Sequence, residues 1–423
     1  MPEILLKNAS INGKIQNLLI KNNIIDYVGT NLPDADIEYD IRGLDVIPGM
    51  IDPHVHVRDL KQSEKEDWSS ASNAALKGGI TTVFDMPNTR PPTVNLQFLN
   101  AKREKAKLAK VNYKFNVAAT SQNLKELAEL LDTKPEDVAA LKLFLAGSNS
   151  NEFVDDEEDI KQIFDLSLKY NLPVIVHTEW QKCVEEYSAK VQNPTVSDHN
   201  FMRNSECSVK GTDLLISLAK EIGNKLYLAH ISTAEEIDII KANKEKCRVF
   251  CEVTPHHLLI NEEILKTAGN FGKVNPPLRT EKDNKRIMQG IIEGTVDTIG
   301  TDHAPHLLSE KLKEYSQAPA GFPGLETALP LLINEVNKGS FDLKKLIEIT
   351  SFNTAKIFNL KNRGQIKEGY FADLTVIDMN KTWKIEAKNF KTKAKYSPYE
   401  GMSGKGDVVM TFVNGELRFE NNR

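Results

Sequence analysis

Histidines are concentrated where strand-length apolar runs end. The chain contains nine histidines. Seven of them lie at or just beyond the carboxyl end of such a run: His54, His56, His177, His230, His256, His303 and His306. In a parallel α/β barrel, functional residues from several strands gather at that end. Because imidazole is a good ligand for zinc and similar cations, the pattern favours a divalent metal site.

The first pair has the spacing of a strand. Residues two apart in a strand point to the same face, so His54 and His56 are expected to project together into the mouth of a barrel and to share one metal. Two hydrogen-bonded core histidines are the alternative. The pair follows Asp52 and a Pro-Gly step at the end of an apolar run, and this position favours the metal site.

A lysine interrupts another apolar run. Leu141, Leu143 and Leu145 share one face, which should pack on helices, and Lys142 then faces the barrel interior. A buried lysine needs a partner or an altered charge state. Carboxylation by carbon dioxide would give an anionic carbamate able to bridge two cations. An ion pair with an internal carboxylate such as Asp302 is the other solution, and the segment alone leaves both open.

Three further strand ends add His177, His230 and Asp302 to the candidate functional residues. The runs that lead to His177 and His230 each end in histidine, which is usually structural when it occurs once. Asp302 has the same parity as Thr298 and Gly300, so it should face inward, where it could take a proton from a metal-bound water. His303 should point away and serve a structural role.

The elements that must position these residues alternate along the chain. Apolar runs of strand length occur at residues 46–57, 81–86, 114–119, 140–146, 173–178, 225–231, 248–253 and 295–302. Helical patterns occur at residues 68–77, 96–107, 157–170, 212–222, 282–292, 325–336 and 343–358. Eight strands alternating with helices predict an α/β fold, a TIM-like (β/α)8 barrel.

The two ends of the chain have a different pattern. Residues 3–47 and 365–420 consist of short alternating strands, with turn signals at Asn12-Gly13 and Asn414-Gly415. We therefore expect a small β-sandwich domain built from residues 1–50 and 360–423, around a barrel at residues 51–359.

Composition narrows the class of protein. Of 423 residues, 40% are hydrophobic and 27% charged, and the net charge of -5 argues against nucleic-acid binding. We expect no membrane association, since no run approaches the roughly 20 apolar residues of a membrane span, and no signal peptide. Four cysteines do not indicate a disulfide framework, so reduced thiols, buried at Cys247 and Cys251, and a cytoplasmic protein are expected.

Several segments together resemble the amidohydrolase superfamily and, within it, the dihydroorotase family, over about residues 45–360. The matching segments are Pro53-His54-Val55-His56-Val57-Arg58-Asp59, Gly79-Ile80-Thr81-Thr82-Val83 leading to Met86-Pro87-Asn88-Thr89, Lys142, His177-Thr178-Glu179, Ala229-His230-Ile231-Ser232 and Asp302-His303-Ala304-Pro305-His306. Each segment is weak evidence by itself, but the ordered combination is specific.

The resemblance implies two zinc ions bridged by carboxylated Lys142 and a hydroxide. One zinc would be held by His54, His56, the carbamate and Asp302, and the other by the carbamate, His177 and His230. Asp302 would be the catalytic residue. Substrate contacts would fall on Arg58, Asn88, Asn275, His306, Ala320 and Gly321. The implied reaction interconverts dihydroorotate and N-carbamoyl-aspartate in pyrimidine biosynthesis.

Arg58 is expected to bind the exocyclic carboxylate of such a substrate; an ion pair with Asp59 or Glu64 is the alternative. Another cyclic amidohydrolase, such as a hydantoinase, dihydropyrimidinase or allantoinase, is the runner-up, and a non-catalytic scaffold subunit is a third hypothesis. The sequence departs from many relatives at Leu60-Lys61 and at residues 147–151, which bears on loop closure over the substrate. The oligomeric state stays open, a homodimer included.

Overall fold

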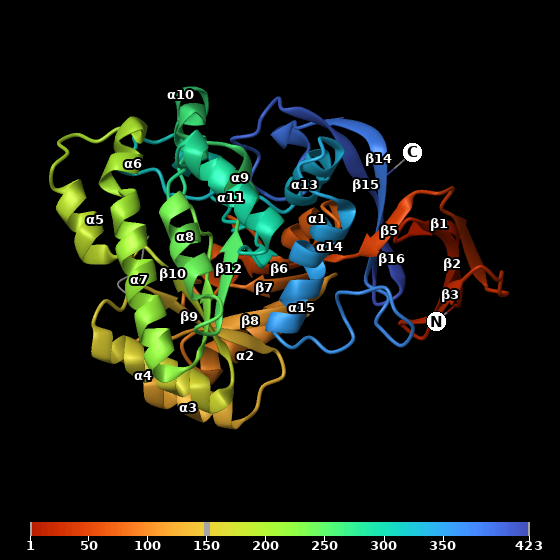
Figure 1. The fold of residues 1–423 in the computed structure, drawn as a ribbon, viewed down its shortest axis with the longest axis horizontal. Helices are drawn as coiled ribbons and strands as arrows, with labels where there is room; N and C mark the ends of the chain where they lie inside the picture. Colours follow the sequence, from red (N-terminus) through yellow and green to blue (C-terminus); the bar gives the residue numbers. More distant parts are fainter. Residues whose placement is uncertain (1, 148–152, 422–423) are drawn as a thin grey trace.

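The computed structural model describes residues 2–147 and 153–421. Its central feature is an eight-stranded parallel sheet that curls into a nearly closed barrel (Figure 1). In order around the barrel, the strands are β6 (Met50–Val55), β7 (Ile80–Asp85), β8 (Asn112–Ala118), β9 (Val138–Phe144), β10 (Pro173–His177), β11 (Lys225–Leu228), β12 (Val249–Val253) and β13 (Thr298–Ile299). A bridge between Val55 and His303 joins the first strand to the segment after the last.

Helices cover the outside of the barrel. The principal ones are α1 (Trp68–Lys77), α2 (Leu96–Ala106), α3 (Leu124–Asp132), α4 (Glu157–Tyr170), α5 (Gln181–Ser188), α7 (Ser205–Ile222), α8 (Ala234–Asn243), α11 (Glu281–Glu293) and α13 (Ala328–Asn337). Leu141, Leu143 and Leu145 pack in the core between strands and helices, as their alternation predicts. The barrel prediction is confirmed, and β9 carries Lys142 on the opposite face.

Two predicted helices differ from those observed. The run at residues 343–358 is interrupted: α14 (Leu343–Ile347) and α15 (Asn353–Ile357) flank a π-helical turn, Glu348–Phe352. In that turn the Ser351 hydroxyl donates to the carbonyl of Gly49, 3.0 Å away, a tertiary contact that sequence periodicity does not show. Helix α7 begins at Ser205, seven residues before the predicted start at residue 212.

The predicted strand at residues 46–57 is also wrong as a single element. Strand β5 (Asp45–Pro48) pairs with β1 (Ile4–Ile11) and β14 (Leu374–Lys384) of the second sheet, whereas β6 belongs to the barrel. Gly49 lies between them, and a Cβ atom there would be 2.1 Å from Cγ2 of Thr81. The chain therefore crosses from one sheet to the other at a point too tight for a side chain.

The second sheet is built from both ends of the chain (Figure 1). Its strands are β1 (Ile4–Ile11), β2 (Lys14–Lys21), β3 (Ile24–Gly29), β4 (Ile37–Asp40), β5, β14 (Leu374–Lys384), β15 (Ser403–Val413) and β16 (Glu416–Glu420). Both predicted turns are confirmed: Asn12 and Gly13 have φ values of 50° and 74°, and Asn414 and Gly415 of 48° and 78°.

The cysteines divide into two kinds. Cys183 of α5 and Cys207 of α7 form a disulfide, so the expectation of reduced thiols is wrong for this pair. Their 24-residue separation gave no signal, because tertiary packing of two helices brings them together. Cys247 and Cys251 are free, as expected, but only Cys251 is buried, whereas Cys247 is half-buried. In the described ranges, no helix has the length and apolar character that crossing a membrane requires.

Candidate metal centre and active site

Strand β6 and the segment after β13 bring three buried candidate ligands together. Nε2 of His56 lies 3.0 Å from Oδ1 of Asp302, and Nε2 of His54 lies 3.4 Å from the same oxygen. One donor atom from each side chain falls within 4.8 Å of the other two. His54 and His56 do point to one face, and the three residues form a candidate metal site.

A second pair of candidate ligands, His177 and His230, lies beside the first group. Nδ1 of His177, at the end of β10, is 3.0 Å from Nε2 of His230, just beyond β11. The His230 ring centroid is 5.1 Å from that of His54. Strand ends far apart in sequence thus place four imidazoles around one point.

Lys142 faces the same site from β9. Its side chain is 1% exposed, and Nζ, 4.9 Å from the centre of the Phe144 ring, has no hydrogen-bond partner among the residues described. The ion pair with Asp302 that was the alternative is therefore not formed. Burial lowers the pKa of Lys142 to about 8, although Glu252 and Asp302 oppose the shift.

The donor set suits divalent cations. Burial lowers the pKa of His56 to about 4, so its imidazole is neutral near pH 7, which is the form that binds metal. Buried polar atoms without a partner in the described chain include Nζ of Lys142 and Nδ1 of His230. A buried, unpartnered amine thus lies beside imidazole and carboxylate donors that could hold a metal ion.

Three side chains contact ring nitrogens of His54, His56 and His177. Oε1 of Glu252 lies 2.8 Å from Nδ1 of His54, and Oδ1 of Asn88 lies 2.7 Å from Nδ1 of His56. Oε2 of Glu179 lies 2.9 Å from Nε2 of His177. Such partners fix the orientation and tautomer of ligating histidines. The sequence did not predict a role for Glu252 or Glu179. The available signal for Glu252 was its place inside an apolar run, and that for Glu179 was its place two residues after the strand-end His177.

Arg58 forms one wall of the site. Its Nε donates to the carbonyl of Pro305 at 3.1 Å, and Nη2 lies 3.0 Å from Nε2 of His306. That same His306 nitrogen is 3.0 Å from the carbonyl oxygen of Ala320. No ion pair of Arg58 with Asp59, Glu64 or another carboxylate occurs in the part of the chain that the structure describes. A buried guanidinium thus remains available to an anion.

One cavity joins all the candidate residues. Its volume is about 360 Å³. It is lined by every predicted metal ligand and substrate contact: His54, His56, Arg58, Asn88, Lys142, His177, His230, Asn275, Asp302, His306, Ala320 and Gly321. Lys65, Arg90 and Lys313 also line it, so cations outnumber the anions Asp302 and Glu310. The cavity can hold a small anionic molecule.

The structure also bears on three neighbouring features of the sequence: His303, Leu60-Lys61 and residues 147–151. His303 turns away from the cavity, as expected, and its Nδ1 accepts from the amide of Gly324 at 3.1 Å. Leu60 and Lys61 lie in a short 3-10 turn, Leu60–Gln62, tied to the Arg90 carbonyl through the Lys61 amide. Of the divergent segment at residues 147–151, only Gly147 falls within the described residues.

Comparisons with known proteins identify the family of this chain. The amidohydrolase family matches residues 46–418. A dihydroorotase from Methanosphaera stadtmanae is 37% identical over 100% of this chain and 97% of its own, and one from Carboxydothermus hydrogenoformans is 35% identical over 99% and 98%. The solved L-hydantoinase (dihydropyrimidinase) from Arthrobacter aurescens superimposes with a TM-score of 0.95 at 27% identity, covering 100% of this chain and 97% of that one. The chain belongs to the amidohydrolase family.

Proposed function

We propose that the chain is a dihydroorotase, which interconverts dihydroorotate and N-carbamoyl-aspartate in pyrimidine biosynthesis. The observation that carries this proposal is the buried Arg58, which has no carboxylate partner in the described chain and lies at the wall of the metal-site cavity. Dihydroorotate is dihydrouracil with an added exocyclic carboxylate, and hydantoin also lacks this group, which a guanidinium binds well. Relatives named dihydroorotase over the full chain support the same assignment.

We propose that the site holds two zinc ions bridged by carboxylated Lys142. His54, His56 and Asp302 would hold one ion, and His177 and His230 the other. When bound, the ions would supply a water-derived nucleophile near pH 7 and polarise a carbonyl. Support comes from the buried, unpartnered Nζ of Lys142 and from its pKa of about 8, which leaves a fraction of neutral amine to react with carbon dioxide.

Asp302 is proposed to move the proton. Burial alone would raise the pKa of its carboxyl, but the neighbouring imidazoles of His54, His56 and His230, with a hydrogen bond from His56, hold the pKa well below its usual range. An ionised carboxylate at the centre of the site can accept a proton from the nucleophile and deliver it to the departing ring nitrogen. In the biosynthetic direction Asp302 would take the proton from the attacking nitrogen as the ring closes and would deliver it to the departing oxygen.

The remaining wall residues are proposed to orient the ring. Arg58 and His306 would bind the carboxylate, and Asn275, whose buried Oδ1 has no partner in the described chain, would accept from a ring N–H. Backbone groups of Ala320 and Gly321 would contact the ring edge. Gly321 has a φ of 118°, and a Cβ atom there would lie 2.7 Å from the Ala304 carbonyl, so only glycine fits.

The setting of the enzyme is part of the proposal. We assign it to the cytoplasm, where nucleotide precursors are made, as a barrel of residues 51–359 with a composite β domain of residues 1–50 and 360–423. In a reducing compartment the Cys183–Cys207 disulfide would have to resist thiols. Its burial, with Cys183 3% and Cys207 0% exposed, would limit their access.

A substrate panel tests the assignment. Zinc-loaded protein is assayed for ring opening of L-dihydroorotate, hydantoin, dihydrouracil and allantoin. We expect kcat/KM for dihydroorotate to exceed that for each ring lacking the carboxylate by at least about 100-fold, the scale of a lost buried charge-assisted contact. Faster turnover of hydantoin or dihydrouracil would favour the activity named for the L-hydantoinase neighbour. A protein that binds no zinc and opens none of the four cyclic amides would favour the hypothesis of a non-catalytic scaffold.

A further inference from the structure

Glu179 is a charged residue that the proposed reaction does not use, yet it touches a candidate ligand. It follows β10, is 0% exposed, and its Oε2 lies 2.9 Å from Nε2 of His177. An ionised carboxylate can only accept, so this contact puts the imidazole proton on Nε2. Nδ1 of His177 is then left with its lone pair, on the side where His230 lies 3.0 Å away.

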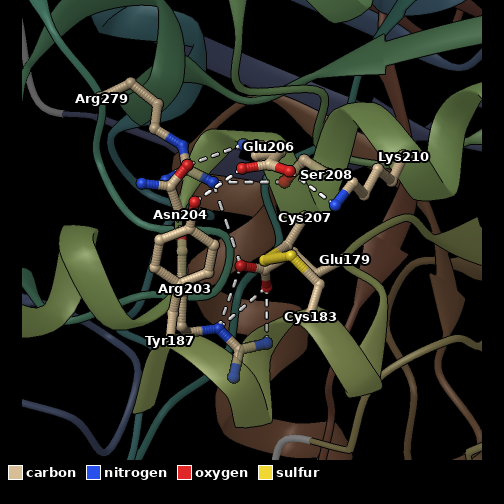
Figure 2. The surroundings of a disulfide bond; sticks show 10 residues. All are labelled: Glu179, Cys183, Tyr187, Arg203, Asn204, Glu206, Cys207, Ser208, Lys210 and Arg279. Carbon is tan, nitrogen blue, oxygen red and sulfur yellow. Dashed lines mark hydrogen bonds and ion pairs between the residues drawn. A yellow bond between two sulfur atoms is a disulfide. The ribbon is translucent and has the colours of Figure 1, made fainter. Parts of the chain in front are cut away.

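Arg203 keeps the Glu179 carboxylate in place. Its Nε lies 3.1 and 3.0 Å from the two carboxylate oxygens, and its Nη2 is 2.6 Å from Oε2 (Figure 2). A guanidinium that makes these contacts favours the ionised form of the Glu179 carboxylate. A carboxylate with fixed donors on one side presents a fixed acceptor to His177 on the other.

Arg279 in turn braces the segment that carries Arg203. Its Nη1 donates to the Arg203 carbonyl and to Oδ1 of Asn200, each at 2.6 Å. Its Nη2 donates to the Ser208 hydroxyl at 3.2 Å and lies 4.0 Å from Oε1 of Glu179 (Figure 2). The second arginine therefore joins the start of α7 to the same carboxylate.

A covalent link runs parallel to the ion pair. Cys183 lies four residues after Glu179 and Cys207 four residues after Arg203, so the disulfide and the ion pair both join positions 24 apart (Figure 2). The Trp180 amide donates to the Cys207 carbonyl at 3.1 Å. A Cβ atom at Gly211 would lie 1.8 Å from the Thr178 carbonyl, so α7 also packs directly against the segment between His177 and Glu179.

We propose that Glu179 is a positioning residue, which fixes the His177 ring so that Nδ1 faces the metal site, and that Arg203 and the Cys183–Cys207 disulfide hold its carboxylate for this purpose. The inference rests on the proposed function, because it assigns His177 to a bound cation. It also gives a role to the unexpected disulfide: the cross-link stabilises the support of one ligand rather than the barrel as a whole.

Zinc affinity in Glu179 variants tests this proposal without relying on turnover. Zinc binding is measured by competition with a chromophoric chelator on Glu179→Gln and Glu179→Ala, together with thermal unfolding. We expect the zinc site that contains His177 to lose about 10-fold affinity in the glutamine variant and about 100-fold in the alanine variant, the range for lost partners of ligating histidines. At saturating zinc, kcat should recover to within a few-fold of the parent.

Glu236→Gln is the matched control. Glu236 is equally buried, and its Oε1 accepts from the hydroxyls of Thr178 and Thr212 at 3.0 and 2.9 Å rather than from a histidine. We expect a change of less than threefold in zinc affinity. Equal affinities in the Glu179 variants and the parent, or equal losses in the Glu179 and Glu236 variants, would overturn the proposal. A parent protein that binds no zinc would instead refute the proposed function.

The disulfide is tested by coupling. Cys183→Ala with Cys207→Ala should weaken the same zinc site three- to tenfold, and the effect should vanish when Glu179 is already alanine, because interactions within one network are not additive. If the cysteine substitutions lowered zinc affinity equally in the parent and in Glu179→Ala, the disulfide would not support the Glu179 carboxylate.

Discussion

Oε1 of Glu252 lies 2.8 Å from Nδ1 of His54, and Gly300 is what leaves room for this contact. A Cβ atom at position 300 would be 2.6 Å from Oε2 of Glu252 and 3.0 Å from Cβ of His54. Glu252 also accepts from the His230 amide at 3.0 Å. One carboxylate on β12 therefore braces parts of both halves of the metal site.

Gly300→Ala should push Glu252 and His54 apart. We expect zinc affinity to fall by about 10- to 100-fold, the range for a disturbed partner of a ligating histidine. Gly290→Ala is the control, because its Cβ would meet only flexible side chains in the helical layer, the closest 3.1 Å away. Chelator competition measures both variants, and equal affinities would show that the Glu252 contact does not orient His54.

Arg58→Lys should separate substrate binding from metal binding. A lysine cannot reproduce the two-pronged contact of guanidinium with carboxylate, so kcat/KM for dihydroorotate should fall at least about 100-fold. Zinc content should stay at the parent level. Arg103→Lys, which alters a half-exposed pair with Asp137, is the control and should change neither quantity. Unchanged turnover in Arg58→Lys would remove Arg58 from the carboxylate site.

Reconstitution of the zinc-free protein should depend on dissolved carbon dioxide. If Lys142 must be carboxylated, zinc added in carbon-dioxide-free buffer should restore little activity, and bicarbonate should restore it over minutes to hours. Lys142→Ala should bind no more than one tight zinc ion and show no response to bicarbonate. Full recovery of the parent without carbon dioxide would contradict the carbamate.

His199 should make the unfolding free energy depend on pH. Its Nε2 lies 2.8 Å from the Val274 carbonyl, and burial, aided by Arg203, lowers its pKa from 6.5 to about 3. The unfolded chain therefore binds a proton below pH 6.5 that the folded chain does not, so stability is complete above pH 6.5 and is lost as the pH falls toward 3.

His199→Gln removes this titration. Between pH 6 and 5, the advantage of the parent over the variant should shrink by about 1 kcal/mol, since one unit of pKa is worth about 1.4 kcal/mol. Urea unfolding of the zinc-free proteins measures it, and the other buried histidines cancel in the difference. Parallel pH profiles for parent and variant would contradict the assignment.

The sequence predicted the barrel and the strand-end residues of its cavity because both follow from short-range periodicity. The expected substrate contacts Asn88, Asn275, His306, Ala320 and Gly321 came from the family resemblance instead, and all five line the cavity. Helices α1 and α4 begin where expected, since Asp67 and Asp156 accept hydrogen bonds from the first-turn amides. His54 and His56 were paired correctly by the two-residue repeat of a strand, which also placed Lys142 opposite its leucine neighbours.

What the sequence did not predict depends on tertiary contacts. Which ring nitrogen of His177 meets Glu179 is set by side-chain rotation in the folded state. The start of α7 is rich in small and polar residues, among them Ser208 and Gly211, which are buried because the helix packs closely on the Thr178 backbone. The Cys183–Cys207 bond likewise depends on how α5 and α7 pack, not on cysteine spacing.

A crystal structure with bound dihydroorotate, recorded with anomalous scattering at the zinc edge, tests the central claim most directly. The account predicts two zinc peaks within about 4 Å of each other, extra density on Nζ of Lys142 between them, and the substrate carboxylate against Arg58. A single peak near His54 and His56 beside an unmodified Lys142 would contradict the proposed centre.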